Sequence, residues 1–274
     1  MKKIVYFDTN VFDHLINNKN GITKIDEINL RKAVNSGRIS IPISLINLEE
    51  TFCALDNYPA EAEKQFLIIS QLGDPSKTTK LPEELIFDDL YSYSLHGEQS
   101  NPYSKKSIIG IDLKELKSRK RRAEFKKIID KIKDEKKEFK LETINARNLV
   151  LGKSTIEKNL TFDQFWESMK RHFVRGLVER TELSEQFRFI NMNNLINLRS
   201  VRLWTGWSIS FVYGQLFEKR KPKPSDSRDM KHAVLASVAD IFVTHDQDFA
   251  ELMERIPIEN FKVFGHLHDL LDYL

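Results

Sequence analysis

Residues 225–252, SDSRDMKHAVLASVADIFVTHDQDFAEL, decide the fold predicted for this chain. Ser225 or Asp226 can cap a helix, which small apolar residues then continue. The run Ile241–Val243 is short, apolar and uncharged, which is typical of a strand buried on both faces. An acidic turn follows it, and a further helix begins near Phe249. We therefore predict a helix, a buried strand, an acidic turn and a second helix.

The turn after this strand contains Asp246 and Asp248. In an open parallel sheet, ligands bind beyond the carboxyl ends of the strands, so acids in this position suit a metal or a substrate. Asp is also a favoured helix cap, and the alternative is that these two residues only cap the helix that follows them.

The composition is that of a globular protein with one large domain, or with a small domain that carries an elaboration. The chain has 274 residues, of which 41% are hydrophobic and 30% charged. No apolar run approaches the roughly 20 residues of a membrane span, and an acid at position 8 comes too early for a signal peptide. A single cysteine, Cys53, excludes an intrachain disulfide and a Cys-based zinc site. These features favour the cytoplasm and argue against a membrane partner.

Two more strand candidates end beside acidic residues. The apolar run at residues 4–7 ends at Asp8, and a third strand, residues 38–43, precedes a helix that carries Glu49 and Glu50. Both resemble the stretch around residue 241. The first has an acid directly after the strand, and the second has its acids in the helix that follows the strand.

The order of these elements predicts a split α/β domain with an insertion. Residues 1–72 and 225–274 are expected to form a domain around a central, mainly parallel sheet, with a last short strand at residues 261–264. Residues 73–224 are expected to form a mainly helical insertion. Its last part, residues 195–224, belongs either to the insertion or to the core.

The insertion is expected to begin with a loop at residues 73–82, which contain Pro and Gly. Residues 112–141 are rich in Lys and Arg and carry an apolar stripe, which predicts one or two amphipathic helices. The net charge of the whole chain is only +3, from 43 basic and 40 acidic residues. The excess of Lys and Arg in residues 112–141 therefore means that the charges are unevenly distributed along the chain. This distribution suits a polyanion held by the basic region, and a solvated helical surface is the alternative.

Acidic residues from both ends of the chain are expected to meet. Because parallel strands end at the same edge of a sheet, side chains far apart in sequence converge there. Converging carboxylates raise one another's pKa unless a cation lies among them, and hard oxygen ligands select Mg²⁺ or Mn²⁺. No glycine-rich phosphate loop is present, which argues against a nucleoside triphosphate site. The candidate sites are Asp8, Glu49 or Glu50, Asp226 with Asp229, and Asp246 with Asp248.

This pattern resembles the PIN-domain nucleases in four motifs that occur in order along the chain. They are a hydrophobic strand ending in Asp8-Thr9-Asn10, Ser44 followed six residues later by Glu50, Asp229 with His232 and Ala233, and a buried strand running into Thr244, Asp246, Asp248 and Phe249. The resemblance covers both ends of the chain. The long region between them departs from the family's pattern.

The resemblance implies a three-layer α/β/α fold and a phosphodiesterase that uses Mg²⁺ or Mn²⁺ to hydrolyse RNA, leaving 5′-phosphate and 3′-hydroxyl ends. It assigns the catalytic, metal-binding acids as Asp8, Glu50, Asp229 and Asp246, with Asp248 as a fifth ligand or an outer acid. It also implies that three polar residues orient the acids or a metal-bound water, namely Thr9, Asn10 and, near Asp246, Thr244.

Several assignments have alternatives. Glu49 is one residue from the family's spacing and should point elsewhere on its helix than Glu50. Asp226 can replace Asp229 as a ligand, although it is the better helix cap. His232 is expected to pack or to form hydrogen bonds rather than to bind a metal. His245 is expected to face away from the acids, and His266 and His268 to lie on the surface.

The expected partner of this site is RNA. Basic residues that can follow its phosphates are Lys117, Arg119, Lys120, Arg121 and Arg122. The leading hypothesis is an endoribonuclease of the toxin or defence-effector type, restrained by an inhibitory protein as in toxin–antitoxin pairs. The alternatives are a structure-specific DNA nuclease and a non-catalytic PIN-like scaffold that binds RNA or protein. A homo-oligomer is compatible with each of them.

Overall fold

The computed structural model of the chain describes residues 2–55, 57–104, 126–127, 129–139, 141, 143–144, 160–183, 185–187 and 191–274. Within these residues the chain forms one parallel sheet of five strands in the order β3-β2-β1-β4-β5. The strands are β1 (Lys3–Phe7), β2 (Ile39–Ile43), β3 (Gly73–Thr78), β4 (Ile241–Val243) and β5 (Lys262–Phe264). The prediction of an α/β fold with a central parallel sheet is confirmed.

The two central strands come from opposite ends of the chain. In β1 and β4, Val5 pairs with Ile241 and Phe7 pairs with Val243, so both strands end level with each other. The side chains of residues 5–7 and 241–243 are buried and alternate between the two faces of the sheet, as the period of a strand requires. This pairing brings the residues after position 7 beside those after position 243.

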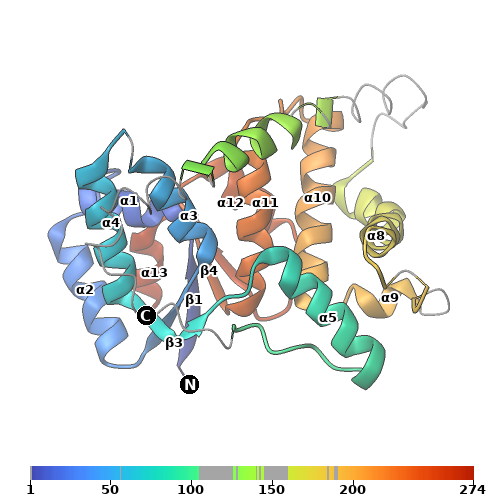
Figure 1. Cartoon of the computed structure of the whole chain (residues 1–274), viewed down its shortest axis with the longest axis horizontal. Coiled ribbons are helices and arrows are strands. Elements are labelled where there is room, and N and C mark those ends of the chain that lie inside the picture. Colours follow the sequence, from blue (N-terminus) through green and yellow to red (C-terminus); the bar gives the residue numbers. More distant parts are fainter. Residues whose placement is uncertain are drawn as a thin grey trace.

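Helices cover both faces of the sheet and complete three layers (Figure 1). One face packs against α1 (Thr9–Asn17), α2 (Lys24–Asn35), α4 (Pro59–Leu72) and α13 (Leu267–Tyr273). The other face packs against α5 (Pro82–His96), α8 (Phe162–Glu179), α10 (Arg199–Phe217), α11 (Asp226–Leu235) and α12 (Gln247–Glu254). The remaining helices are α3 (Leu45–Ala54), which contributes to both cores, the short α9 (Met192–Leu195) and the 3₁₀ turn η1 (Ala236–Val238).

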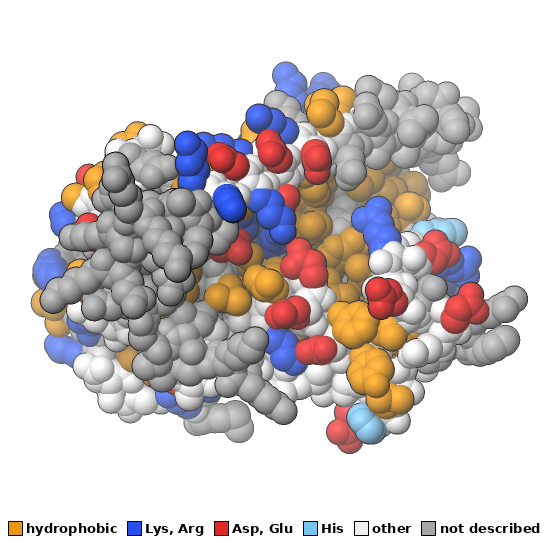
Figure 2. All heavy atoms as spheres, viewed as in Figure 1, with side chains coloured by type: hydrophobic (Ala, Val, Ile, Leu, Met, Phe, Trp, Pro, Cys, Tyr) orange, Lys and Arg blue, Asp and Glu red, His pale blue; other side chains and the backbone are white. Residues whose placement is uncertain are grey.

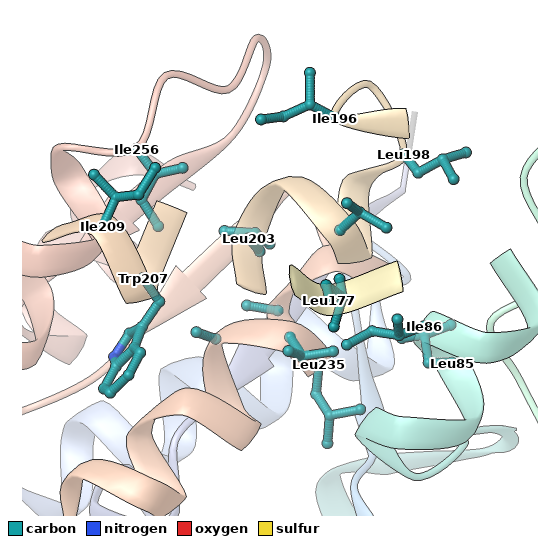
Figure 3. Packing of buried hydrophobic residues seen from close by; sticks show 14 of the residues in the cluster. Leu85, Ile86, Leu177, Ile196, Leu198, Leu203, Trp207, Ile209, Leu235 and Ile256 are labelled. Atoms are coloured by element: carbon teal, nitrogen blue, oxygen red, sulfur yellow. The ribbon is translucent and has the colours of Figure 1, made fainter. Parts of the chain in front are cut away.

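The helices of the expected insertion share a hydrophobic core with the sheet. Figure 3 shows side chains of α5, α8, α10 and α11 meeting in this core, among them Leu85, Leu177, Leu203 and Leu235. Trp207 of α10 is 1% exposed within the same cluster. Burial of this apolar surface stabilises the sheet and the helices together. The helix α10, for which two alternatives were open, contributes to the same cluster as α5, α8 and α11.

The loop expected from residue 73 is wrong in its first part. Residues Gly73–Thr78 form β3, which pairs with β2 and extends the sheet beyond the expected boundary at residue 72. Its sequence, GDPSKT, has no apolar alternation, because an edge strand is stabilised through its backbone and does not need two buried faces. Gly73 is required at this place, since a Cβ there would collide with the Ile43 side chain and the Ile69 carbonyl oxygen.

Part of the basic region is described. Residues 129–139 are helical, and Ile129 and Ile132 are each 4% exposed. The basic residues singled out for phosphate contacts, Lys117, Arg119, Lys120, Arg121 and Arg122, lie outside the described residues. In the described part of the chain, no helix combines the length and the apolar character needed to cross a membrane.

Candidate metal centre

Three helices begin with side-chain caps at the carboxyl edge of the sheet. Asp8 caps α1, Ser44 caps α3 and Asp246 caps α12, and each follows a strand directly or within a few residues. The caps satisfy backbone N–H groups that have no partner within the helix. Local capping chemistry thus gathers polar side chains at one edge of the sheet.

Asp8 is the more buried of the two acidic caps, with 7% of the residue exposed. Its Oδ1 accepts a hydrogen bond from the Thr9 backbone N–H (2.6 Å), and its Oδ2 accepts one from the Thr244 hydroxyl (2.8 Å). The Thr244 hydroxyl in turn accepts from Asn10 Nδ2 (3.2 Å) and from the Asp246 backbone N–H (3.1 Å). The Asp8 carboxylate is therefore held in a fixed orientation by residues of both central strands' ends.

Thr9, Asn10 and Thr244 form hydrogen bonds to Asp8 or to one another. Thr9 supports Asp8 through its backbone, and its hydroxyl donates to Asn47 Oδ1 (2.9 Å). Asn10 and Thr244 act in series on Asp8. Thr244 was expected near Asp246, and it contacts that residue through the backbone while its hydroxyl proton goes to Asp8.

Glu50 and His232 complete the cluster from two helices. His232 Nε2 lies 3.2 Å from Glu50 Oε2 and 3.4 Å from Asp8 Oδ1. One oxygen of Asp8, one of Glu50 and a ring nitrogen of His232 all lie within 4.8 Å of one another, which is close enough to share one metal ion. These three residues can therefore hold a metal ion.

The orientation of His232 is set by the sheet beneath it. Its Nδ1 lies 2.8 Å from the hydroxyl of Tyr6, a fully buried residue of β1, and that hydroxyl lies 3.0 Å from Ser44 Oγ. A histidine whose second nitrogen is held in this way presents the other nitrogen in a defined direction, as is common for metal-binding histidines. His232 is thus both hydrogen-bonded, as expected, and placed as a possible ligand, which was not expected.

The charges of the cluster depend strongly on one another. Burial raises the pKa of Asp8, and the charge of Glu50 raises it further against the opposing effect of His232. Burial alone would raise the pKa of Glu50, but His232, Thr9 and Arg228 lower it to about 2. Burial alone would lower the pKa of His232, but Asp8 and Glu50 raise it above its ordinary value. When it is protonated, His232 offsets the negative charges of Asp8 and Glu50.

Asp229 belongs to the same electrostatic environment. Its pKa lies well above the ordinary value, first because of burial and then because of the charges of Asp8, Asp226, Asp246 and Glu50. Asp229 and His232 are three residues apart on α11, so their side chains share one side of the helix. Such a group of mutually repelling carboxylates is stabilised by a bound cation.

The other candidate acids have different partners. Glu49 pairs with the buried Arg228 (2.9 Å), so the expectation that Glu50 is the residue at the site agrees with the geometry. Asp226 is fully buried and pairs with Arg220 (2.9 Å). Asp248 pairs with Lys223 at the surface, where its side chain is 53% exposed. Asp248 thus forms an exposed ion pair, which lowers its pKa, and it is not among the acids that act on Asp229.

Asp246 has two roles, as a helix cap and as a nearby negative charge. Its Oδ1 accepts a hydrogen bond from the Phe249 backbone N–H (3.1 Å), as the capping alternative requires, and its charge also contributes to the raised pKa of Asp229. It therefore caps α12 at the border of the acidic cluster. His245, beside it, stacks between His14 (4.5 Å between ring centroids) and His266 (4.9 Å), apart from the acids.

Comparison of the chain with protein-family models, with curated proteins and with solved structures gives no match. The function of the site is therefore inferred from its geometry alone. The third member of the cluster, His232, lies three residues after Asp229 in the sequence. Residues at this spacing share one side of a helix, which is the signal that could have placed His232 at the site.

Proposed function

We propose that this protein is a metal-dependent nuclease of the PIN type that hydrolyses phosphodiester bonds of RNA. The observation that carries the proposal is the cluster of Asp8, Glu50 and His232, within 4.8 Å of one another at the carboxyl edge of a parallel sheet. Asp229 supports it, since burial and then the charges of the surrounding carboxylates raise its pKa. Perturbed acids gathered at such an edge are typical of a functional site.

The expected metal is Mn²⁺ or Mg²⁺. Carboxylate oxygens suit both ions, while an imidazole ligand favours Mn²⁺ over Mg²⁺. When bound, such an ion supplies an acidified water and offsets negative charge on the phosphate being cleaved. Asp8, Glu50 and His232 hold the ion, and Thr244 and the Thr9 amide keep the Asp8 carboxylate in place.

Asp229 and Asp246 extend the acidic environment beyond these three residues. We assign Asp229 as a further ligand, directly or through water, because burial and the charges of nearby carboxylates, Asp8 and Glu50 among them, raise its pKa. Asp246 orients the start of α12 and contributes negative charge at the border of the site. Asp248 is left out of the ligand set, since Lys223 neutralises it.

The test is cleavage of end-labelled single-stranded RNA by the purified protein with Mn²⁺ or Mg²⁺. Asp8→Asn and Glu50→Gln are expected to lower the rate by about 100-fold or more, beyond the 10–100-fold effect of outer-shell substitutions. Asp248→Asn is the matched control, since it removes an exposed acid of the same motif, and it is expected to keep nearly the full rate. Equal rates for the wild type and all three variants would exclude the assignment.

Two further measurements separate the alternatives. A panel of flap-containing and single-stranded DNA substrates tests the DNA nuclease, and preferred cleavage of the flap would favour it. Calorimetric titration with Mn²⁺ tests the non-catalytic scaffold, which is favoured if no binding occurs at millimolar metal. The toxin or defence role is tested by induced expression in bacteria, where growth arrest by the wild type but not by Asp8→Asn is expected.

A further inference from the structure

A charged cavity lies apart from the metal centre. It has a volume of about 560 Å³ and lies between α8, α9 and the first turn of α10. We call it the basic pocket, and its charged or titratable lining comprises Lys170, Arg171, His172, Arg175, Arg202 and a single acid, Glu167. In Figure 1, α10 stands between α11, which carries His232, and α8. Figure 2 shows Lys, Arg and His side chains interspersed with Asp and Glu over this part of the molecule.

The positive charge of the basic pocket is only partly compensated. Glu167 is paired with Lys170 at 2.6 Å, which leaves three arginines without an acid in the lining. Arg175 is exposed and has no ion pair among the described residues. The Nε of Arg202 is buried and has no hydrogen-bond partner in the described part of the chain. Because this Nε is not exposed to the pocket, Arg202 contributes its positive charge to the lining rather than a hydrogen bond from that atom.

The arginines are also arranged for a shared ligand. Arg171 and Arg175 are four residues apart on α8, so their like charges lie side by side and repel. Arg171 Nε donates to Asn193 Oδ1 (2.9 Å), which orients the guanidinium and leaves its two terminal nitrogens without a partner among the described residues. Guanidinium groups held in this way match the paired oxygens of a phosphate.

We propose that the basic pocket binds a phosphate-bearing ligand. Its volume lies within the roughly 300–1,000 Å³ range of small-molecule sites and exceeds what one phosphate ion needs, so it suits a ligand of nucleotide size. The phosphate groups can come from a free nucleotide or from the backbone of a polynucleotide. Binding there does not depend on the proposed nuclease activity, because the pocket shares no residue with the metal centre.

The experiment is a binding titration of the full-length protein in EDTA, which prevents metal-dependent cleavage. The probes are tripolyphosphate, ADP and a fluorescein-labelled single-stranded RNA of random sequence. Arg175→Gln is expected to weaken the affinity for the phosphate probe that binds by about tenfold, the effect of one charge-assisted contact. Arg180→Gln is the matched control, since Arg180 is an exposed arginine at the end of the same helix and outside the pocket lining, and it should change affinity less than about twofold.

The probes distinguish the sources of the phosphate. Binding of ADP that Arg175→Gln weakens assigns the pocket to a free nucleotide, and binding of the RNA alone assigns it to a polynucleotide backbone. The proposal is overturned if no probe binds at millimolar concentration, if Arg175→Gln leaves every affinity unchanged, or if Arg180→Gln weakens binding as much as Arg175→Gln. Loss of RNA cleavage in Asp8→Asn with unchanged binding in this assay would separate the two sites.

Discussion

Replacement of Glu50 by glutamine tests the electrostatics of the metal centre without metal. The pKa of Glu50 is about 2 in the folded protein against 4.5 for a free side chain, because His232, Thr9 and Arg228 together outweigh the effect of burial. This difference corresponds to about 3 kcal/mol of preference for the ionised side chain in the folded state. Relief of the repulsion between Glu50 and Asp8 offsets part of that loss in the variant.

The expected effect has a definite pH dependence. Because the folded-state pKa lies below the unfolded value, the stabilisation is present above pH 4.5 and is lost as the pH falls towards 2. Glu50→Gln is therefore expected to lower the free energy of unfolding at pH 7 by about 2–3 kcal/mol and Tm by roughly 4–10 °C. At pH 3, less than half of this difference should remain.

The assay is thermal and urea-induced unfolding followed by circular dichroism in EDTA, from pH 8 down to pH 3. The control is Glu251→Gln, which removes an exposed glutamate of α12 and is expected to change stability by less than about 0.5 kcal/mol. If Glu50→Gln is as stable as the wild type at pH 7, or if the difference between them is constant from pH 7 to pH 3, then His232, Thr9 and Arg228 do not stabilise the ionised form of Glu50.

Three further outcomes are expected. Thr244→Val removes the hydroxyl that donates to Asp8 Oδ2 and should weaken Mn²⁺ binding by about 10–100-fold in calorimetry with little change in fold. Mn²⁺ should raise the Tm of the wild type by mass action, and Asp8→Asn should abolish most of that rise in differential scanning fluorimetry. Gly206→Ala places a methyl group against the Ile256 side chain and should destabilise the protein by about 1–3 kcal/mol in urea unfolding. In the same assay, Gly176→Ala should stabilise the protein by about 0.5–1 kcal/mol, because the added methyl group meets no atom within 4 Å and alanine favours the helix.

Features that depend on local sequence were predicted well. Four of the five strands lie where the sequence indicated them, and for the central strand β4 the reason is that a strand buried on both faces needs a continuous apolar stretch. The exception is β3, whose polar sequence GDPSKT forms the edge of the sheet and carries no such pattern. The choice of Glu50 over Glu49 also agrees with the geometry, since neighbouring residues of a helix point about 100° apart.

Contacts between elements were predicted less well. Asp248 forms an ion pair with Lys223 from the preceding linker, a contact that its position in the motif does not indicate. His232 lies between Asp8 and Glu50 because Tyr6, on the sheet beneath, holds its other nitrogen. Neither partner can be identified from the residues around Asp248 or His232 alone, since each contact joins segments that only packing brings together.

The sequence by itself determined the parallel strands, the helix caps that follow them and the acids at their ends, because burial pattern and capping act over a few neighbouring residues. Only the tertiary structure decided which side chains share the centre. The pairing of β1 with β4 and the packing of α11 across them bring residues 8, 50 and 232 within 4.8 Å, and those distances depend on the whole core rather than on any one segment.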